Sequence, residues 1–269
     1  MYNGLRERTS ATTQKAWSDH THDRLVNTHA NNKHRLAPEA GEYVRIQPML
    51  VLASNSPRRR RLLAFGGWNF KVVPADVNED PRAGEPPVDY VTRLAREKAL
   101  AVAPEVSPDS IIVAADTTVV DAGERLAGEI LGKPADEAQA AEMLRRLRGR
   151  VHQVYTAIAL LRVKDQALLS DWCRTDVRMR AYSEAEIADY VASGDPLDKA
   201  GGYAIQSGMF DPVEEIQGCY ANVVGLPLCL LARLLRELGE PVPQDLPECC
   251  QGKDFEGCSI GPLAFQEDQ

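Results

Sequence analysis

Apolar and polar residues follow two different periods along the middle of the chain, and these periods predict strands and helices in turn. Short apolar or β-branched runs predict strands at 49–54, 70–77, 110–120 and 151–163. Apolar residues three and four positions apart, with N-cap residues and glycine stops, predict helices at 57–65, 86–103, 135–149, 183–194 and 226–239. In the second of these helices we expect Val91, Leu94, Ala95 and Leu100 on the buried side. Because strands alternate with helices, we expect an α/β fold with one core and a mixed β-sheet.

The two ends of the chain differ from its middle. Residues 1–47 are polar, show no sustained period and hold four of the five histidines. Low hydrophobicity favours a disordered leader over a metal-binding or targeting arm, and Met49 is an alternative start of translation to Met1. Residues 240–269 are rich in proline and glycine and are expected to form a tail. The folded domain is therefore expected to span residues 48–239.

Composition and charge narrow the class of protein. Of the 269 residues, 44% are hydrophobic and 26% are charged, which is typical of a globular domain. The formal net charge of −8 argues against non-specific nucleic-acid binding. Apolar runs stay well below ~20 residues and the N-terminus has no apolar signal segment, so we expect neither a membrane span nor export. The six cysteines are then expected to be reduced thiols in the cytoplasm, with a bridge from Cys258 to Cys249 or Cys250 as the alternative.

Four consecutive arginines follow a Ser-Pro pair and raise an electrostatic difficulty. Ser56 and Pro57 are typical of a helix N-cap and first helical position, yet the N-terminus of a helix carries a partial positive charge that disfavours cations. Arg58 and Arg59 fall nearest the buried side of this helix, whereas Arg60 and Arg61 point toward solvent. A phosphate bound by Arg58, Arg59 and the helix N-terminus resolves the difficulty. The alternative is a solvated charge run whose arginines cover the core.

An acidic residue, Asp116, interrupts the buried run IIVAADTTVV. An unpaired carboxylate in such a strand is costly, so we expect Asp116 to bind a metal, to pair with a base or to face a cleft. A turn that begins at Asp116 is the alternative. Thr117, Thr118 and the valines after them favour a strand that continues instead.

The stretch SGDPLDKAGGYAIQS, residues 193–207, brings two carboxylates, Lys199 and two glycines together before a strand expected to end at Gln206. Glycines and a lysine suit a polyphosphate or a metal, and an ordinary polar surface turn is the alternative. His152 lies alone in a strand, and we expect it to pack or to hydrogen-bond rather than to catalyse. In the absence of a recognisable Ser-His-Asp or Cys-His nucleophile, the cations and carboxylates together indicate metal-assisted attack of water on a phosphoryl centre.

Seven motifs in fixed order give the chain a resemblance to a known family. They are LASNSPRR, VTRLAREKA, AADTTVV, GKP, VHQVYTAIAL, PLDKAGGYAIQ and NVVGLPL. In this order they resemble the Maf family of nucleoside triphosphate pyrophosphatases, also called septum formation inhibitor, over about residues 49–238. The resemblance implies a Maf/ITPase-like α/β fold, in which a mixed twisted sheet flanked by helices carries a deep nucleotide-binding cleft, and a homodimer.

The resemblance also implies a reaction and the residues that perform it. The reaction is hydrolysis of a nucleoside triphosphate between the α- and β-phosphates, with Mg²⁺ or Mn²⁺ as the divalent ion. Asp116 corresponds to the general base, and Glu79 and Asp116 together correspond to the metal ligands. Lys98 and Lys133 correspond to the lysines of the catalytic cleft.

Two further groups of residues concern binding of the substrate. Ser54 and Arg59 correspond to the family's phosphate-binding loop, and Lys199 adds a positive charge for phosphate. The residues that distinguish the branches of the family are Arg58, Thr117 and Gln206. They resemble the branch that prefers dTTP and UTP. A physical reason for this preference is that a guanidinium and a carboxamide pair with pyrimidine carbonyls and N3–H. The 7-methyl-GTP branch instead carries a tryptophan, which stacks on a purine. Ser207 stands where family members usually have glycine, so the loop beside the base departs from the family.

The expected activity is therefore a pyrophosphatase that acts on dTTP, UTP and modified pyrimidine triphosphates. A nucleoside triphosphate is the expected partner, and neither nucleic acid nor a membrane is expected. A 7-methyl-GTP-type pyrophosphatase is one alternative. A non-catalytic nucleotide-binding regulator of cell division is the other.

Overall fold

The computed structural model describes residues 48–121 and 129–243. The chain divides into two units, Met1–Arg45 and Ile46–Gln269, and all described residues belong to the second. The expected leader, most of the expected tail and the cysteines of the alternative bridge lie outside the described residues. Across the described part, every helix is too short or too polar to cross a membrane.

Helices and strands alternate along the described chain, as the periods of the sequence predict. The first half contains β1 (Met49–Leu52), α1 (Pro57–Phe65), β2 (Phe70–Val72), α2 (Pro87–Val102), the 3-10 turn η1 (Ala103–Glu105), β3 (Ser110–Asp121), β4 (Glu129–Leu131) and α3 (Glu137–Leu147). The second half contains β5 (Val151–Arg162), β6 (Ala167–Met179), α4 (Glu184–Ala192), the 3-10 turns η2 (Asp195–Asp198) and η3 (Ala200–Gly202), β7 (Val213–Gln217), α5 (Tyr220–Val224) and α6 (Leu228–Glu237).

One mixed sheet of seven strands organises these elements. Its strand order is β2-β1-β3-β5-β6-β7, and β4 pairs with β3 off this path. β1 is parallel to both β2 and β3, whereas the pairs β3–β5, β5–β6 and β6–β7 are antiparallel. The sheet is therefore mixed, and the expected α/β fold is confirmed.

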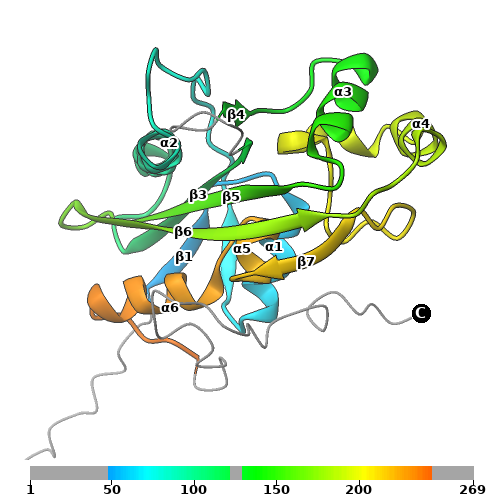
Figure 1. Ribbon diagram of the computed structural model, residues 1–269. Helices are drawn as coiled ribbons and strands as arrows, with labels where there is room; N and C mark the ends of the chain where they lie inside the picture. Colours follow the sequence, from blue (N-terminus) through cyan, green and yellow to red (C-terminus); the bar gives the residue numbers. More distant parts are fainter. Residues whose placement is uncertain (1–47, 122–128, 244–269) are drawn as a thin grey trace, which may run out of the picture. The chain divides into compact units, whose positions relative to one another are not determined.

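Helices cover both faces of the sheet (Figure 1). On one face α2 packs Val91 and Leu94 against Ile112 of β3. On the other face α1, α5 and α6 pack onto the same strands, with Leu62 and Leu63 fully buried. α3 and α4 form a third apolar cluster toward the C-terminal end of β3. The sheet is thus buried on both sides where β1 and β3 run in parallel.

Two expectations about local structure were wrong, and one strand was missed. Leu100 is 47% exposed, because it lies nine residues after Val91 and therefore on the opposite side of α2; Lys98 takes the place on the buried stripe. The chain around Gln206 forms a loop rather than a strand, since Gly201 and Gly202 both turn the backbone with φ near +70°. β6, which pairs with β5 along its whole length, carries no prediction at all.

The parallel pairing of β1 with β3 determines where the candidate site lies. Leu52 pairs with Val113, and the next backbone N–H, that of Ala53, donates to the Val113 carbonyl at 2.9 Å. The chain that leaves β1 into α1 therefore runs beside the centre of β3, where Asp116 and Thr117 are located. Side chains of β3 alternate between the α2 face and the α1 face.

Candidate active site

A cleft of about 390 Å³ opens beside the centre of β3, within the range typical of small-molecule sites. All ten residues that the sequence predicts for the site line this cleft: Ser54, Arg58, Arg59, Glu79, Lys98, Asp116, Thr117, Lys133, Lys199 and Gln206. They come from the β1–α1 turn, the loop after β2, α2, β3, the segment after β4 and the η2–η3 region. The structure therefore gathers every predicted site residue in one place.

The start of α1 has the N-cap that the sequence predicts. The Ser56 side chain accepts a hydrogen bond from the backbone N–H of Arg59 at 3.4 Å, and Pro57 occupies the first turn. Arg58 and Arg59 are half-buried, whereas the two arginines after them are exposed. The first turn contains no acidic residue to offset the partial positive charge of the helix N-terminus.

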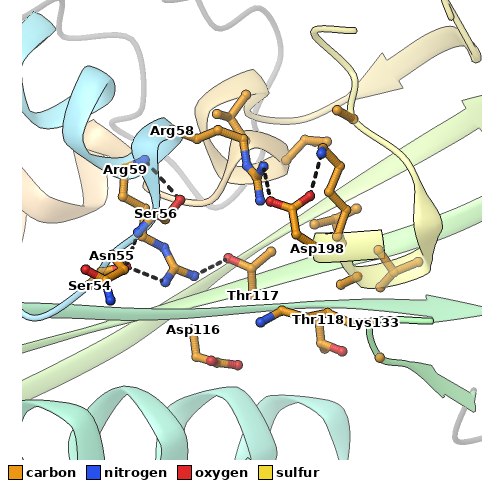
Figure 2. A pocket seen from close by; sticks show the side chains of 18 of the residues that line it. Ser54, Asn55, Ser56, Arg58, Arg59, Asp116, Thr117, Thr118, Lys133 and Asp198 are labelled. Carbon is orange, nitrogen blue, oxygen red and sulfur yellow. Dashed lines mark hydrogen bonds and ion pairs between the residues drawn. The ribbon is translucent and has the colours of Figure 1, made fainter. Parts of the chain in front are cut away.

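Arg59 is a cation held by neutral acceptors. Its Nη1 donates to Ser54 Oγ at 3.2 Å and its Nη2 to Thr117 Oγ1 at 3.2 Å (Figure 2). Its Nε donates to the Gly225 carbonyl at 2.9 Å. Burial lowers the pKa of Arg59, against the opposing charge of Asp116. Three of the five guanidinium N–H groups are thus engaged, and the remaining donors and the full charge are available to an anion in the cleft.

Lys98 lies between two carboxylates on the opposite face of β3. Its Nζ is 2.6 Å from Asp116 Oδ1 and 2.6 Å from Glu79 Oε1, and Lys98 and Asp116 are both buried. Figure 2 shows Asp116 and Thr117 on opposite sides of the strand, as the alternation of side chains requires. Lys133 Nζ is 4.0 Å from Glu79 Oε2 and remains largely exposed. Of the roles open to Asp116, the structure pairs it with a base at the edge of a cleft.

The two carboxylates beside Lys98 differ in their affinity for protons. Burial raises the pKa of Asp116 above its ordinary value, against the opposing charges of Lys98 and Arg59. Glu79 is also partly desolvated, but the hydrogen bond from Lys98 and the charges of Lys98 and Lys133 lower its pKa below the ordinary value. Two carboxylates with opposite pKa shifts around one cation are typical of an acid–base site.

The loop that carries Glu79 is fastened to α2. The Tyr90 hydroxyl donates to the Glu79 carbonyl at 2.8 Å. Arg93 binds the Glu85 carboxylate through two N–H groups at 2.6 and 2.7 Å, and both of these side chains are nearly buried. Nη2 of Arg93 also donates to the Asp80 carbonyl at 3.2 Å. These contacts hold both ends of the loop, so the place of Glu79 is set by the helix.

Glu79 and Asp116 fit a hard divalent cation. An ammonium nitrogen 2.6 Å from an oxygen of each carboxylate marks a position where positive charge is stabilised. Within residues 48–121 and 129–243, no group of three or more His, Cys, Asp or Glu side chains could hold a metal ion on its own. Mg²⁺ commonly takes one or two protein carboxylates and completes its shell with water and substrate phosphates, so two carboxylates suffice.

A second ionic group stands at the other end of the cleft. Arg58 Nη1 lies 3.6 Å from Asp198 Oδ2 (Figure 2). Lys199 is buried, and its Nζ contacts the Asp195 carbonyl at 2.5 Å, Asp195 Oδ1 at 2.9 Å and Asp198 Oδ1 at 2.6 Å. Oε1 of Gln206 is buried without a hydrogen-bond partner among the described residues. Gln206 itself lines the cleft, and its amide oxygen is a hydrogen-bond acceptor.

Sequence reasoning missed several contributors to the site. Gly225, Thr156 and Asn222 contact Arg59 or Thr117, directly or through one intermediate group. Asn222 and Gly225 lie in the motif NVVGLPL and Thr156 lies in VHQVYTAIAL, two motifs whose residues received no role in the site. Tyr90 and Arg93 lie in the motif-bearing helix and were likewise not assigned.

Comparison with known proteins gives the same picture over most of the chain. The family model described as "Maf-like protein" matches residues 49–238. A relative from Anaeromyxobacter dehalogenans (strain 2CP-1 / ATCC BAA-258), named dTTP/UTP pyrophosphatase, is 49% identical over 203 residues, which cover 74% of this chain and 99% of the relative. A relative of the same name from Geobacter sulfurreducens is 48% identical over 190 residues, covering 71% of this chain and 96% of the relative.

Among solved structures, the Staphylococcus aureus Ham1 protein is 17% identical with a TM-score of 0.35, covering 49% of this chain and 72% of that chain. The family model extends across nearly all of the described residues and includes the ten predicted residues that line the cleft. The chain belongs to the Maf-like protein family.

Proposed function

We propose that the chain is a nucleoside triphosphate pyrophosphatase that hydrolyses dTTP and UTP to the monophosphate and pyrophosphate. The observation that carries the proposal is the division of charge in the cleft. Arg59 is a cation whose hydrogen-bond acceptors are all neutral. On the other face of the strand, the carboxylates of Glu79 and Asp116 both contact the ammonium group of Lys98. The first arrangement suits phosphate oxygens, and the second suits an attacking water and a divalent ion. The names of the relatives support this activity.

In this proposal Asp116 is the general base. Its Oδ1 is engaged by Lys98 at 2.6 Å, which leaves Oδ2 to accept a proton from water. The raised pKa of Asp116, caused by burial, makes the carboxylate a better proton acceptor than an ordinary aspartate. The water oxygen then bonds to phosphorus as the bridging P–O bond between the α- and β-phosphates breaks, and the pyrophosphate leaves with the bridging oxygen.

Cations in the cleft stabilise the charge that develops on the triphosphate. Arg59 contributes its free N–H groups, with Ser54 beside it, and Lys133 is exposed enough to reach a phosphate from the other side. Lys199 fits this role less well, because all three of its N–H donors meet acceptors on Asp195 and Asp198. Its position instead favours support of Asp198, the partner of Arg58.

Glu79 and Asp116 are the residues that would hold a divalent ion, Mg²⁺ or Mn²⁺. When bound, such an ion neutralises phosphate charge and polarises the phosphoryl group. Arg58, Thr117 and Gln206 are proposed to read the nucleoside, and the amide oxygen of Gln206 has no hydrogen-bond partner among the described residues. Homodimer formation and a cytoplasmic location, both expected from the resemblance or from the cysteines, remain part of the proposal.

The test is pyrophosphate release from dTTP, UTP and 7-methyl-GTP in parallel with Mg²⁺ present. We expect Asp116→Asn to lose at least about 100-fold in turnover, since general-base catalysis is commonly worth that much. Asp171→Asn is the matched control, because Asp171 pairs with Arg233 on the surface, outside the cleft. Undiminished turnover of Asp116→Asn refutes the assignment of the base. Binding of dTTP without pyrophosphate release favours the regulator, and a preference for 7-methyl-GTP favours the other branch.

A further inference from the structure

A chain of buried hydroxyl groups runs from the cleft into the protein. Thr117 Oγ1 lies 2.9 Å from Thr156 Oγ1, and Thr156 Oγ1 lies 2.9 Å from the backbone carbonyl of Asn222. Thr156 and Asn222 are fully buried, whereas Thr117 lines the cleft. At the cleft end, Thr117 Oγ1 receives Nη2 of Arg59 at 3.2 Å.

The direction of each hydrogen in this chain follows from the groups at its two ends. A carbonyl only accepts, so the single hydroxyl hydrogen of Thr156 points to the Asn222 carbonyl. Thr156 has then no hydrogen left for Thr117, and the Thr117 hydroxyl must donate to Thr156. A guanidinium only donates, so Arg59 occupies one lone pair of Thr117. What remains of Thr117 toward the cleft is one acceptor lone pair.

The carbonyl that orients this chain is firmly held. The side-chain Nδ2 of Asn222 donates to the Val154 carbonyl at 3.0 Å and to Thr175 Oγ1 at 2.9 Å, which fastens α5 to β5 and β6. At the end of α5, Gly225 has φ of +118°, and a β-carbon there would lie 3.3 Å from Thr117 Oγ1. Gly225 thus packs closely against Thr117 on the protein side, and Thr117 lines the cleft on the other.

We infer that Thr156, oriented by the Asn222 carbonyl, is a positioning residue that makes Thr117 an acceptor toward the substrate. Phosphate oxygens are acceptors themselves, so Thr117 faces the nucleoside rather than the triphosphate. It reads a hydrogen-bond donor of the nucleoside: the imide N–H of uracil or thymine, or a hydroxyl of the sugar. This inference rests on the proposed function and adds the chemical group that Thr117 recognises.

The experiment measures kcat/KM for two pairs of substrates. The pair UTP and CTP tests the imide, since cytosine has an acceptor where uracil has N3–H. The pair dTTP and 2′,3′-dideoxythymidine triphosphate tests the 3′-hydroxyl. For each pair, the ratio is kcat/KM of the substrate that carries the donor (UTP or dTTP) divided by kcat/KM of the substrate that lacks it. In the unmodified protein one of the two ratios should be above one. Thr156→Val should reduce that ratio about tenfold, the effect of one hydrogen bond. The other ratio should not change.

Three further variants keep the outcome interpretable. Thr156→Ser retains the hydroxyl and should restore the ratio. Thr117→Val removes the acceptor itself and should lower the same ratio as Thr156→Val, even where Thr156→Val does not fold. Thr92→Val is the control, because the buried Thr92 hydroxyl has no partner among the described residues, and its removal should leave both ratios unchanged.

The inference is overturned if Thr156→Val or Thr117→Val keeps both ratios while it lowers activity on all substrates alike, which is the result of a merely structural role. It is also overturned if Thr156→Ser fails to restore the ratio. Absence of dTTP and UTP hydrolysis in the unmodified protein is a different result, and it refutes the proposed function instead.

Discussion

Mild acid is expected to destabilise the fold through one histidine, His152. The residue is fully buried in β5, where Nε2 lies 2.7 Å from the Tyr203 hydroxyl and the two rings meet edge to face at 5.3 Å. Nδ1 is buried without a partner in the part of the chain that the structure describes. A protonated imidazole would have to bury a second N–H with no acceptor. Burial accordingly lowers the pKa of His152 to about 4, against the opposing charge of Asp121.

The sign and size of the effect follow from linkage. In the unfolded chain His152 takes a proton near pH 6.5, whereas in the folded protein it remains neutral until pH is about 4. Between these values the unfolded state binds more protons, so the free energy of unfolding falls as the pH falls. A displacement from 6.5 to 4 is worth about 3 kcal/mol in full, and about 2 kcal/mol of it is lost between pH 8 and pH 5.

Urea denaturation at pH 8, 7, 6 and 5 measures this loss. The comparison is the double variant His152→Phe/Tyr203→Phe, which replaces both polar partners by apolar rings of similar shape and titrates nothing. Carboxylates with strongly lowered pKa values, such as Glu85 and Glu186 at about 2, are present in both proteins. They therefore change the free energy of unfolding with pH by the same amount in both. We expect the unmodified protein to lose about 2 kcal/mol more than the double variant. Equal losses in the two proteins would refute the reasoning from burial.

Two substitutions next to the cleft test its geometry. Arg93→Lys keeps the charge but loses the two parallel hydrogen bonds to Glu85. We expect it to lower the free energy of unfolding by roughly 1.5–3 kcal/mol and to lower kcat/KM. Arg96→Lys, on the exposed side of the same helix, is the control and should change neither quantity. Gly225→Ala should cost roughly 1–3 kcal/mol through its positive φ and also raise KM, because its β-carbon would press on Arg59 and Thr117. Gly239 also has a positive φ, but a β-carbon there would meet open space among the described residues. Gly239→Ala should therefore lower stability without changing KM. Equal effects of the two glycine variants on KM would contradict the argument.

The elements that the sequence predicts are those whose pattern agrees with their burial. α1 and α4 begin at Ser56 and Ser183, whose side chains cap them as expected, and the capping box with Glu186 is present. β6 was missed because its alternation is disguised: Thr175 is fully buried on the inner face, whereas Trp172 is 42% exposed on the outer one. A period of two is difficult to recognise when a polar residue is inside and a large aromatic residue is outside.

The site was predictable to the extent that it depends on side-chain identity. All ten side chains predicted for the site line the cleft, including Glu79, which the resemblance alone pointed out. The groups that orient them were not predictable, because two of them are backbone carbonyls, those of Gly225 and Asn222. Every residue has a backbone carbonyl, so the identity of a residue does not indicate that its carbonyl has a role in the site. Only the path of the chain through α5 brings these carbonyls to Arg59 and Thr156.

The same reasoning explains why a run of arginines stands at the positive end of a helix. A cation in the first turn is disfavoured by roughly 0.3–1 kcal/mol, and Arg59 also gives up water without gaining a carboxylate. Its neutral acceptors come from the β1–α1 turn, β3 and the end of α5, so three separate parts of the fold maintain an unfavourable charge in one position. Lys98 in contrast has its charge balanced on the other face of β3. A triphosphate supplies the anion that Arg59 lacks in the folded protein. Because the charge of Arg59 is not compensated before the substrate binds, its attraction to the phosphates contributes fully to binding. Substitution of Arg59 should therefore raise KM more than substitution of any other predicted site residue.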